Sequence, residues 1–349
     1  MFLLQTFKSP PLFFDDVAFN EIPKVERVET YLDIAFNNAT KATDAARSVE
    51  MGDKLRKSKH VEKIRIETIA KSLCSSLDLL LTRFPQIDDL APFYYELLCA
   101  TIDYGTFKQS LGAVLWAKHQ IKSFERIYLG QLSRVKEFPL INATRRAFYG
   151  RSTSVLKQIK KNLEFLEQCR KTMRRYPALK TGRVTIVIAG SPNVGKSSIL
   201  ARLTGSAPKT APYPFTTQDL NLGYDEDGVQ YIDTPGLLDR PLDERNPIEL
   251  HAILALKHLA SAIVFVIDPT ETCGYTIKEQ RNLLLDIKKR FELPMIVVSN
   301  KVDTGEKFEK SILVSAKTGE GIPELKRAIS ALAPTLKQEE HQSPDTTLQ

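Results

Sequence analysis

The sequence predicts an antiparallel helical bundle followed by a doubly wound α/β domain with a mostly parallel sheet. Over residues 25–176, apolar residues recur every three or four positions, which is the period of amphipathic helices. After a break containing Pro and Gly at 177–182, short β-branched runs alternate with helical segments, as in parallel α/β folds. The chain has 349 residues, enough for two domains that each bury a core.

The first half is predicted to form a bundle because its apolar stripes extend over many helical turns. The clearest stripes are Leu32, Ala35, Ala39, Ala42 and Ala46; Ile66, Ile69, Leu73, Leu77, Leu80 and Phe84; and Leu156, Ile159, Leu163 and Leu166. The small alanines of the first stripe indicate close helix packing. We interpret all three stripes as core contacts between antiparallel helices. On this basis we assign residues 1–178 to a helical domain.

The second half is predicted to contain strands that alternate with helices. Strands are expected at 184–189, 229–232, 262–267, 295–299 and 311–314, and helices at 197–203, 248–259, 277–291 and 323–332. The strand runs are apolar throughout, as in a buried parallel sheet. We assign residues 183–333 to this α/β domain. The polar residues 334–349 are expected to be a disordered tail.

Charge is unevenly distributed between the two halves. Residues 1–182 hold 30 Lys and Arg against 20 Asp and Glu, a net charge of +10, whereas residues 183–349 hold 19 against 22, a net charge of −3. A basic half favours a polyanion such as RNA or an anionic membrane surface, although a merely solvated basic surface explains the charge equally well. The basic clusters are Lys54, Arg56, Lys57 and Lys59; Arg145, Arg146 and Arg151; and Arg170, Lys171, Arg174 and Arg175. The last cluster is interpreted as having no nearby acidic partners, so it is the better candidate for phosphate contacts.

Cysteine content and hydropathy indicate a cytoplasmic protein. The chain has 4 cysteines and no Cys-x-x-Cys pair, so we interpret them as reduced thiols and not as zinc ligands or disulfides. The partly apolar start is broken by a lysine and two prolines and does not match a signal peptide. No apolar run approaches the ~20 residues that span a bilayer. We expect no stable membrane association.

A phosphate-binding loop follows the first predicted strand. Residues 190–197 read Gly-Ser-Pro-Asn-Val-Gly-Lys-Ser, which is G-x-x-x-x-G-K-S between a strand and a helix. The glycines allow backbone N–H groups to surround phosphates, and the helix N-terminus favours their negative charge. Lys196 is expected to contact the β- and γ-phosphates, and the Ser197 hydroxyl to bind magnesium. The predicted nucleotide contacts here are Gly190, Ser191, Pro192, Asn193, Val194, Gly195, Lys196, Ser197 and Ser198.

A second motif closes the next predicted strand. It consists of Asp233, Thr234, Pro235 and Gly236. By itself this sequence is an ordinary turn, but its position after the phosphate-binding loop gives it a role. Asp233 is expected on the magnesium side, and the Gly236 N–H at the γ-phosphate.

The next two motifs predict which base is bound. They consist of Asn300, Lys301 and Asp303 after one strand, and Ser315, Ala316 and Lys317 after the next. The Asp303 carboxylate can accept two hydrogen bonds from guanine, from N1–H and the amino group, and adenine lacks this donor pair. Losing such a pair costs about 3–5 kcal/mol, so the motif favours GTP over ATP. The Ala316 N–H can meet guanine O6.

These four motifs, in this order, resemble the translation-factor-related class of P-loop GTPases. Between them, Tyr213, Pro214, Phe215, Thr216 and Thr217 resemble the first switch of the Obg-like GTPases. The resemblance implies that Thr217 completes the magnesium shell with Ser197 and Asp233, with Thr216 as the rival assignment. It also implies that Phe215, Thr216 and Thr217 contact the nucleotide, and that Lys196, Thr217 and Gly236 support catalysis.

Further segments resemble the nucleolar GTP-binding protein 1 family within the Obg-like group. They are residues 268–275, which read Asp-Pro-Thr-Glu-Thr-Cys-Gly-Tyr, residues 84–88 and residues 92–97. The resemblance covers most of residues 1–333. It implies a helical domain before the GTPase domain and a role in assembling the large ribosomal subunit. Eukaryotic members carry a long C-terminal extension, so this chain resembles a short archaeal form, and a nucleolar location is not expected.

The second switch predicts slow hydrolysis of GTP. Many GTPases place a water-orienting Gln just after the Asp-x-x-Gly motif, but here those positions are Leu237 and Leu238. Arg240 and Arg245 are interpreted as solvated loop charges and not as arginine fingers. Asn193 has two open interpretations. In related GTPases an Asn at this position helps to hold potassium, which would join GTP, GDP and Mg²⁺ as a cofactor; alternatively Asn193 only caps the loop backbone.

Two functions remain open at this point. In the first, a monomeric ribosome-assembly GTPase binds ribosomal RNA and the large subunit or its precursor through the basic helical domain. In the second, a signalling or membrane-surface GTPase uses that domain to bind a protein or anionic lipid, although no lipidation motif or basic amphipathic terminal helix is found. Asn300 and Asp303 disfavour a third class, an ATP-driven P-loop enzyme.

Overall fold

A computed structural model describes residues 19–48, 52–205, 208–214, 219–240, 242–245, 247–304 and 306–339. The chain forms two units that do not follow the chain order. The helical unit consists of Ala18–Gln86 and Ile102–Arg174, and the sheet unit contains Ile87–Thr101 and the chain from Arg175 on.

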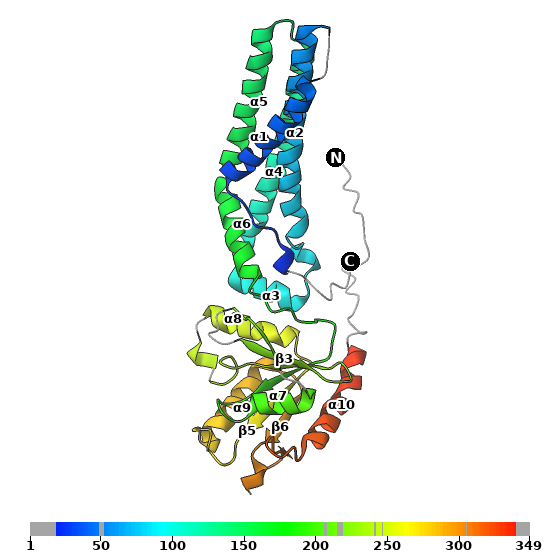
Figure 1. Ribbon diagram of the computed structural model, residues 1–349. Helices are drawn as coiled ribbons and strands as arrows, with labels where there is room; N and C mark the ends of the chain where they lie inside the picture. Colours follow the sequence, from blue (N-terminus) through cyan, green and yellow to red (C-terminus); the bar gives the residue numbers. More distant parts are fainter. Residues whose placement is uncertain are drawn as a thin grey trace, which may run out of the picture. The chain divides into compact units, whose positions relative to one another are not determined.

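The helical unit is a bundle of long helices that run side by side (Figure 1). After a 3-10 turn at Phe19–Glu21, its helices are α1 (Val28–Arg47), α2 (Lys54–Arg83), α4 (Tyr104–Arg134), α5 (Phe138–Gln158) and α6 (Lys160–Met173). Asp53 and Asp103 begin α2 and α4, because each carboxylate accepts a hydrogen bond at 2.8 Å from a backbone N–H of the first turn. The predicted helical bundle is confirmed.

The predicted apolar stripes form the core of this bundle. All members of the second and third stripes are at most 2% exposed, and Ala35 and Ala39 of the first stripe are also buried. Ala42 is only half-buried, and the neighbouring Thr43 is 0% exposed. The Thr43 hydroxyl can be buried there because it donates to the Thr40 carbonyl at 2.9 Å and accepts from Arg65.

The sheet unit contains one sheet of seven strands in the order β2-β3-β4-β1-β5-β6-β7. The strands are β1 (Thr185–Ala189), β2 (Lys209–Ala211), β3 (Leu220–Tyr224), β4 (Gln230–Asp233), β5 (Ala262–Ile267), β6 (Met295–Ser299) and β7 (Ile312–Leu313). Neighbours from β4 to β7 pair in parallel, as predicted, and all five predicted strands are present. The antiparallel edge formed by β2 and β3 was not predicted.

Helices cover both faces of this sheet. They are α7 (Lys196–Thr204), α8 (Pro247–Ala255) with a 3-10 turn at Leu256–His258, α9 (Ile277–Phe291) and α10 (Ile322–Glu339). Further 3-10 turns lie at Leu242–Glu244 and Val302–Thr304. Ile186 and Ile188 of β1 belong to a core shared with α7 and α10. Since side chains alternate along a strand, Val187 faces the opposite side.

Helix α3 (Pro92–Thr101), preceded by a 3-10 turn at Ile87–Asp89, belongs to the sheet unit, although the sequence placed it in the helical half. It lies against α8, where His251 is 3.0 Å from Glu96. The buried Tyr94 hydroxyl donates to the Pro177 carbonyl at 2.8 Å and accepts from the Leu179 N–H at 2.9 Å. An amphipathic pattern shows that a helix buries one face, but not against which neighbour, so this placement was not predicted.

Helix α10 extends further than predicted. It continues through Pro334 to Glu339, so residues 334–339, expected to be part of a disordered tail, are helical. Apart from the proline, these positions are mostly occupied by residues with good helix propensity. The remaining residues of the expected tail lie outside the described part. Across that part, no helix combines the length and the apolar character needed to cross a bilayer.

Candidate nucleotide-binding site

The phosphate-binding loop connects β1 to α7 through two glycines with positive φ. Gly190 has φ +139° and Gly195 has φ +98°, which side chains rarely tolerate. A Cβ atom would lie 2.4 Å from the Val266 carbonyl oxygen at Gly190, and 2.2 Å from Nδ2 of Asn300 at Gly195. Both positions therefore require glycine for close backbone approach, as the motif predicted.

Lys196 begins α7 and points into the loop. Its ammonium group donates to the carbonyls of Gly190 and Ser191, both at 2.9 Å, and the residue is 7% exposed. Burial lowers the pKa of Lys196, while the charge of Asp233 opposes this shift. An ammonium group in this position can contact phosphates from inside the loop.

Ser197 and Asp233 come together from α7 and β4. The Ser197 hydroxyl donates to Oδ2 of Asp233 at 2.5 Å, and Nδ2 of Asn221 donates to the same oxygen at 3.0 Å. Oδ1 of Asp233 is buried and has no hydrogen-bond partner among the described residues. A buried carboxylate oxygen without a partner, beside a hydroxyl, fits the oxygen ligands that magnesium prefers.

The other predicted magnesium ligand cannot be placed. Phe215, Thr216 and Thr217 lie outside the described residues. In the described part, no cluster of three or more His, Cys, Asp or Glu side chains could hold a metal. Among the described residues, Ser197 and Asp233 are the predicted magnesium ligands that lie together.

The segment after Asp233 turns back on the phosphate-binding loop. Thr234 donates to the Ile188 carbonyl at 3.3 Å, and the Gly236 N–H donates to Asp239 at 2.9 Å. Leu237 and Leu238 are 2% and 0% exposed, and the Gly190 N–H donates to the Leu238 carbonyl at 3.2 Å. Buried leucines cannot orient a water molecule, which agrees with the expectation from their side chains.

Arg245 differs from its predicted role as a solvated charge. Its side chain is 5% exposed and lies 3.3 Å from Asp239. It also donates to the carbonyls of Gly236 and Leu237, at 2.6 and 3.0 Å. Arg245 therefore fixes the backbone of the second switch, whereas Arg240 is exposed as expected. Spacing alone did not reveal these contacts, because they depend on how the loop folds.

Asn300 connects the two ends of the site. It is 3% exposed, and its amide donates to the Val194 carbonyl of the phosphate-binding loop at 2.8 Å. Its Oδ1 accepts from the Ala316 N–H at 3.0 Å. One side chain thus joins the phosphate-binding loop to the segment 315–317.

Asp303 lies exposed beside this junction. Its Oδ1 accepts from the buried Ser315 hydroxyl at 2.8 Å. Arg202 of α7 braces the neighbouring segment by donating to the carbonyls of Ala316 and Lys317, at 3.0 and 2.6 Å. A carboxylate held in this way can accept paired hydrogen bonds from a base edge.

The remaining predicted contacts lie around the phosphate-binding loop. Ser191, Pro192, Asn193 and Val194 form the loop itself, Ser198 is exposed in the first turn of α7, and Pro235 lies in the turn after Asp233. Asn221, Arg202 and Asp268 contact site residues but were not predicted to do so. Of these three residues, only Asp268 could have been found from the sequence, because it is the first residue of the family-like segment 268–275.

The loop, the serine–aspartate pair and the base-side carboxylate define a P-loop protein of the GTP-binding class. The comparisons then identify the family. Residues 19–179 match the NOG1 N-terminal helical domain, and residues 247–303 match nucleolar GTP-binding protein 1. The chain belongs to the nucleolar GTP-binding protein 1 family.

Individual proteins are similar to this chain over different lengths. An uncharacterised protein of Methanocaldococcus jannaschii is 38% identical over 285 residues, which cover 82% of this chain and 81% of that protein. Nucleolar GTP-binding protein 1 of Drosophila melanogaster is 32% identical over 315 residues, which cover 89% of this chain and 46% of the relative. The chain thus spans less than half of that longer relative. A crystal structure described as nucleolar GTP-binding protein 1 of Plasmodium falciparum is 32% identical, with a TM-score of 0.41, and covers 48% of this chain and 93% of that one.

Proposed function

We propose that the protein is a switch that binds GTP, hydrolyses it slowly and acts in the assembly of the large ribosomal subunit. The observation that carries the proposal is the junction at Asn300, which ties the phosphate-binding loop to the base-side segment. Family membership supports the ribosomal role, since the longer relatives are named for the nucleolus. The proposed location is the cytoplasm, and the proposed active form is a monomer.

In this proposal, each motif has one task. Lys196 and the loop N–H groups bind the phosphates, while Asp303, held by Ser315, selects guanine. The Ala316 N–H donates to Asn300, so that bond breaks when the N–H meets guanine O6. The residues that would hold magnesium are Ser197, Thr217 and Asp233, and the ion would neutralise phosphate charge. The Gly236 N–H donates to Asp239, so that bond breaks when Gly236 turns to a γ-phosphate. Hydrolysis releases Thr217 and Gly236, and the two switches relax.

Slow GTP hydrolysis follows from Leu237 and Leu238, which cannot orient a water molecule. Potassium is proposed to accelerate the reaction. Asn193 is exposed in the loop, with φ +60°. We expect GTP turnover in potassium chloride to exceed that in sodium chloride by at least about tenfold, a small part of the roughly 10³ to 10⁵ that an arginine finger supplies. Phosphate release measured in both salts tests this. Asn193→Ala should remove the difference, and equal wild-type rates in the two salts would contradict it.

The basic cluster of Arg170, Lys171, Arg174 and Arg175 is not fully available for RNA contacts, because one of its members is already paired. Arg170 is paired with Glu167 by two hydrogen bonds, at 2.7 and 2.8 Å, and its side chain is 9% exposed. The hydrogen bond to Glu167 raises the pKa of Arg170. The expectation that this cluster lacks an acidic partner is therefore wrong for Arg170.

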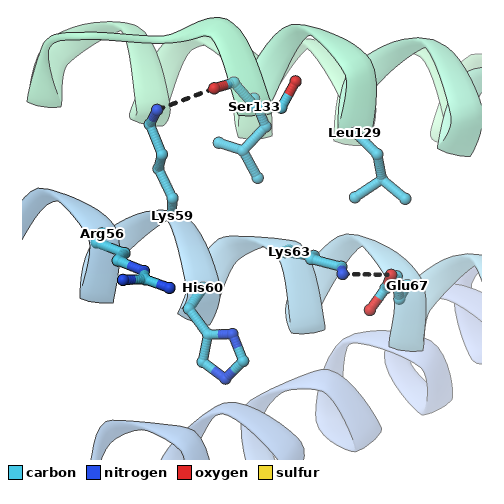
Figure 2. A pocket seen from close by; sticks show the side chains of 8 residues that line it. Arg56, Lys59, His60, Lys63, Glu67, Leu129 and Ser133 are labelled. Atoms are coloured by element: carbon cyan, nitrogen blue, oxygen red, sulfur yellow. Dashed lines mark hydrogen bonds and ion pairs between the residues drawn. The ribbon is translucent and has the colours of Figure 1, made fainter. Parts of the chain in front are cut away.

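A groove between α2 and α4 is the better candidate for RNA contact (Figure 2). It is lined by Arg56, Lys59, His60, Lys63, Glu67, Leu129, Leu132 and Ser133. Lys63 lies 3.8 Å from Glu67, and Lys59 donates to the Ser133 carbonyl at 3.0 Å. Three cations against one carboxylate leave the groove positive, and its open mouth suits a phosphodiester backbone.

The groove predicts a defined salt dependence of RNA binding. Neutralising Arg56 and Lys59 together, as Arg56→Gln and Lys59→Gln, should weaken binding to large-subunit RNA. The slope of log affinity against log salt should become shallower by about 1–2, since each phosphate contact contributes roughly 0.7–0.9. Filter binding across a salt series measures this slope.

A matched pair of lysines serves as the control. Lys157 is exposed and Lys160 has a side chain 55% exposed, outside the groove. Lys157→Gln with Lys160→Gln removes the same charge, so an equal loss would show that only net charge matters. GDP affinity should stay constant in both double variants. Sedimentation with anionic vesicles but not with ribosomal particles would instead support the membrane-surface alternative.

A further inference from the structure

The segment 268–275 is built around one buried carboxylate, that of Asp268. The residue follows β5 and is 0% exposed. Its backbone is fixed by the buried Gln280 of α9, whose side chain accepts from the Asp268 N–H at 2.8 Å and donates to the Asp268 carbonyl at 2.9 Å. The position of the carboxylate is therefore set by the sheet and a covering helix, not by the loop alone.

Five hydrogen bonds converge on the two oxygens of this carboxylate. Oδ1 accepts from the N–H and the hydroxyl of Thr270, at 3.1 and 2.6 Å. Oδ2 accepts from the Thr272 hydroxyl at 3.1 Å, the Cys273 N–H at 2.9 Å and the Lys301 ammonium at 2.6 Å. Burial alone would raise the pKa of Asp268, but the hydrogen bonds from Lys301 and Thr270 outweigh burial and lower it. The group is an ionised, fully paired anchor.

Lys301 is the only one of these partners that belongs to the base-side motif. Its ammonium group also donates to the Thr272 hydroxyl at 2.8 Å, and its side chain is 29% exposed. Its φ is +64°, a left-handed value that costs a non-glycine residue of order 1–3 kcal/mol. Such a conformation persists only where the surroundings hold it. Here the anchored side chain is one such contact, beside the Lys301 carbonyl, which accepts from the Thr304 N–H at 3.1 Å and the Thr304 hydroxyl at 2.7 Å.

Lys301 lies between the two other residues of the base-side motif. Asn300 precedes it and joins the phosphate-binding loop, and Asp303 follows two residues later. The backbone at Lys301 therefore sets the direction of the chain from Asn300 to the base-side carboxylate. A small rotation there would move Asp303 away from the base edge.

We propose that Asp268 is a positioning residue for guanine recognition, which acts with Thr272 by anchoring the Lys301 ammonium group. The anchor holds residues 300–303 in the conformation that presents Asp303 to the base. The segment 268–275 would therefore contribute to nucleotide binding. This proposal rests on the proposed guanine site. No contact between Asp268 and the nucleotide is required.

The test is the release of a fluorescent GDP analogue from the full chain, followed by stopped flow. Asp268→Asn keeps the shape but removes the charge, and it should speed GDP release roughly ten- to a hundredfold, the effect of losing a charge-assisted hydrogen bond. ADP affinity depends on the phosphate-binding loop and should not change. If Asp268 only stabilised the fold, Asp268→Asn would weaken the binding of GDP and ADP alike. The effect would then not be specific to guanine.

Two comparisons separate positioning through Lys301 from a loose loop. Thr270→Val removes the hydroxyl hydrogen bond to Asp268 and the contact with the Thr272 hydroxyl, but no bond to Lys301. It should leave GDP release unchanged. Lys301→Met should also speed release, and the double variant Asp268→Asn with Lys301→Met should release GDP no faster than the faster single variant. Additive effects in the double variant would overturn the proposal.

The failure of this proposal can be told from failure of the guanine site itself. If the wild-type protein binds ADP as tightly as GDP, the guanine site fails. If the wild-type protein prefers GDP and Asp268→Asn releases it at the wild-type rate, the positioning role fails. Should Asp268→Asn not fold, Thr272→Val replaces it, because it removes the second partner of Lys301. Unchanged GDP release in Thr272→Val would then overturn the proposal.

Discussion

Replacement of Asp303 by asparagine should convert the protein from guanine to xanthine nucleotides. The carboxylate is held by Ser315 at 2.8 Å, and an amide of the same shape can keep that contact through its oxygen. Its NH₂ group would face the donors of guanine, whereas xanthine offers an oxygen there. We expect the binding free energy of GDP to weaken by about 3–5 kcal/mol, roughly 150- to 5,000-fold in affinity, because the bound base buries the mismatched groups. Calorimetry with GDP, xanthosine diphosphate and ADP measures all three affinities.

The control for this substitution is an exposed acid in the same unit. Glu226→Gln removes a charge in the turn between β3 and β4, and it should leave all three affinities unchanged. If Asp303→Asn binds GDP as the wild type does, Asp303 does not read the base. If Asp303→Asn binds neither GDP nor xanthosine diphosphate, the substitution has disrupted the segment and has not changed its base specificity.

Substitution of Gly195 by alanine should strongly weaken binding of every nucleotide. The new Cβ would lie 2.2 Å from Nδ2 of Asn300, and the backbone φ of +98° disfavours any side chain. The clash acts on the phosphate-binding loop and on the Asn300 junction together. Losing two hydrogen bonds to charged phosphates costs about 3–6 kcal/mol, so GDP affinity should fall roughly 10²- to 10⁴-fold. Fluorescence titration with a GDP analogue measures the loss.

The other end of α7 provides a matched control. Gly205 also has a positive φ, +66°, but a Cβ there meets nothing within 4 Å. Gly205→Ala should therefore cost only the backbone strain, of order 1–2 kcal/mol of stability, and leave GDP affinity intact. Equal losses of affinity in the two variants would show that backbone strain at either end of α7, and not the contact with Asn300, causes the loss.

Sequence patterns predicted the elements of the fold better than their partners. The parallel strands were evident because runs such as Ala262–Ile267 are apolar throughout. Strand β3 (Leu220–Tyr224) was missed, since it contains an Asn and a Gly and lies towards the antiparallel edge, where one face can stay polar. The placement of α3 could not be predicted, because periodicity shows which face is buried but not what covers it.

The site shows the same division between local and distant information. The loop 190–197 and the base-side motif were found from spacing, since each is a continuous segment whose backbone shape requires particular residues. The contact between Asp268 and Lys301 joins positions 33 residues apart, and Arg245 is buried by the folding of its own loop. Such contacts depend on how separate loops meet, and no local pattern records them.

The insertion of α3 into the sheet unit has a consequence for synthesis of the chain on the ribosome. Phe93, Tyr94, Leu97 and Leu98 of α3 are buried in the finished protein, but α8, which it lies against, follows ~150 residues later and emerges roughly 10–30 s afterwards at typical translation rates. During that interval the nascent chain carries an apolar helix without its α8 neighbour. The order of synthesis therefore makes this stretch a site where nascent-chain chaperones would bind, and the delay ends only when α8 has left the exit tunnel.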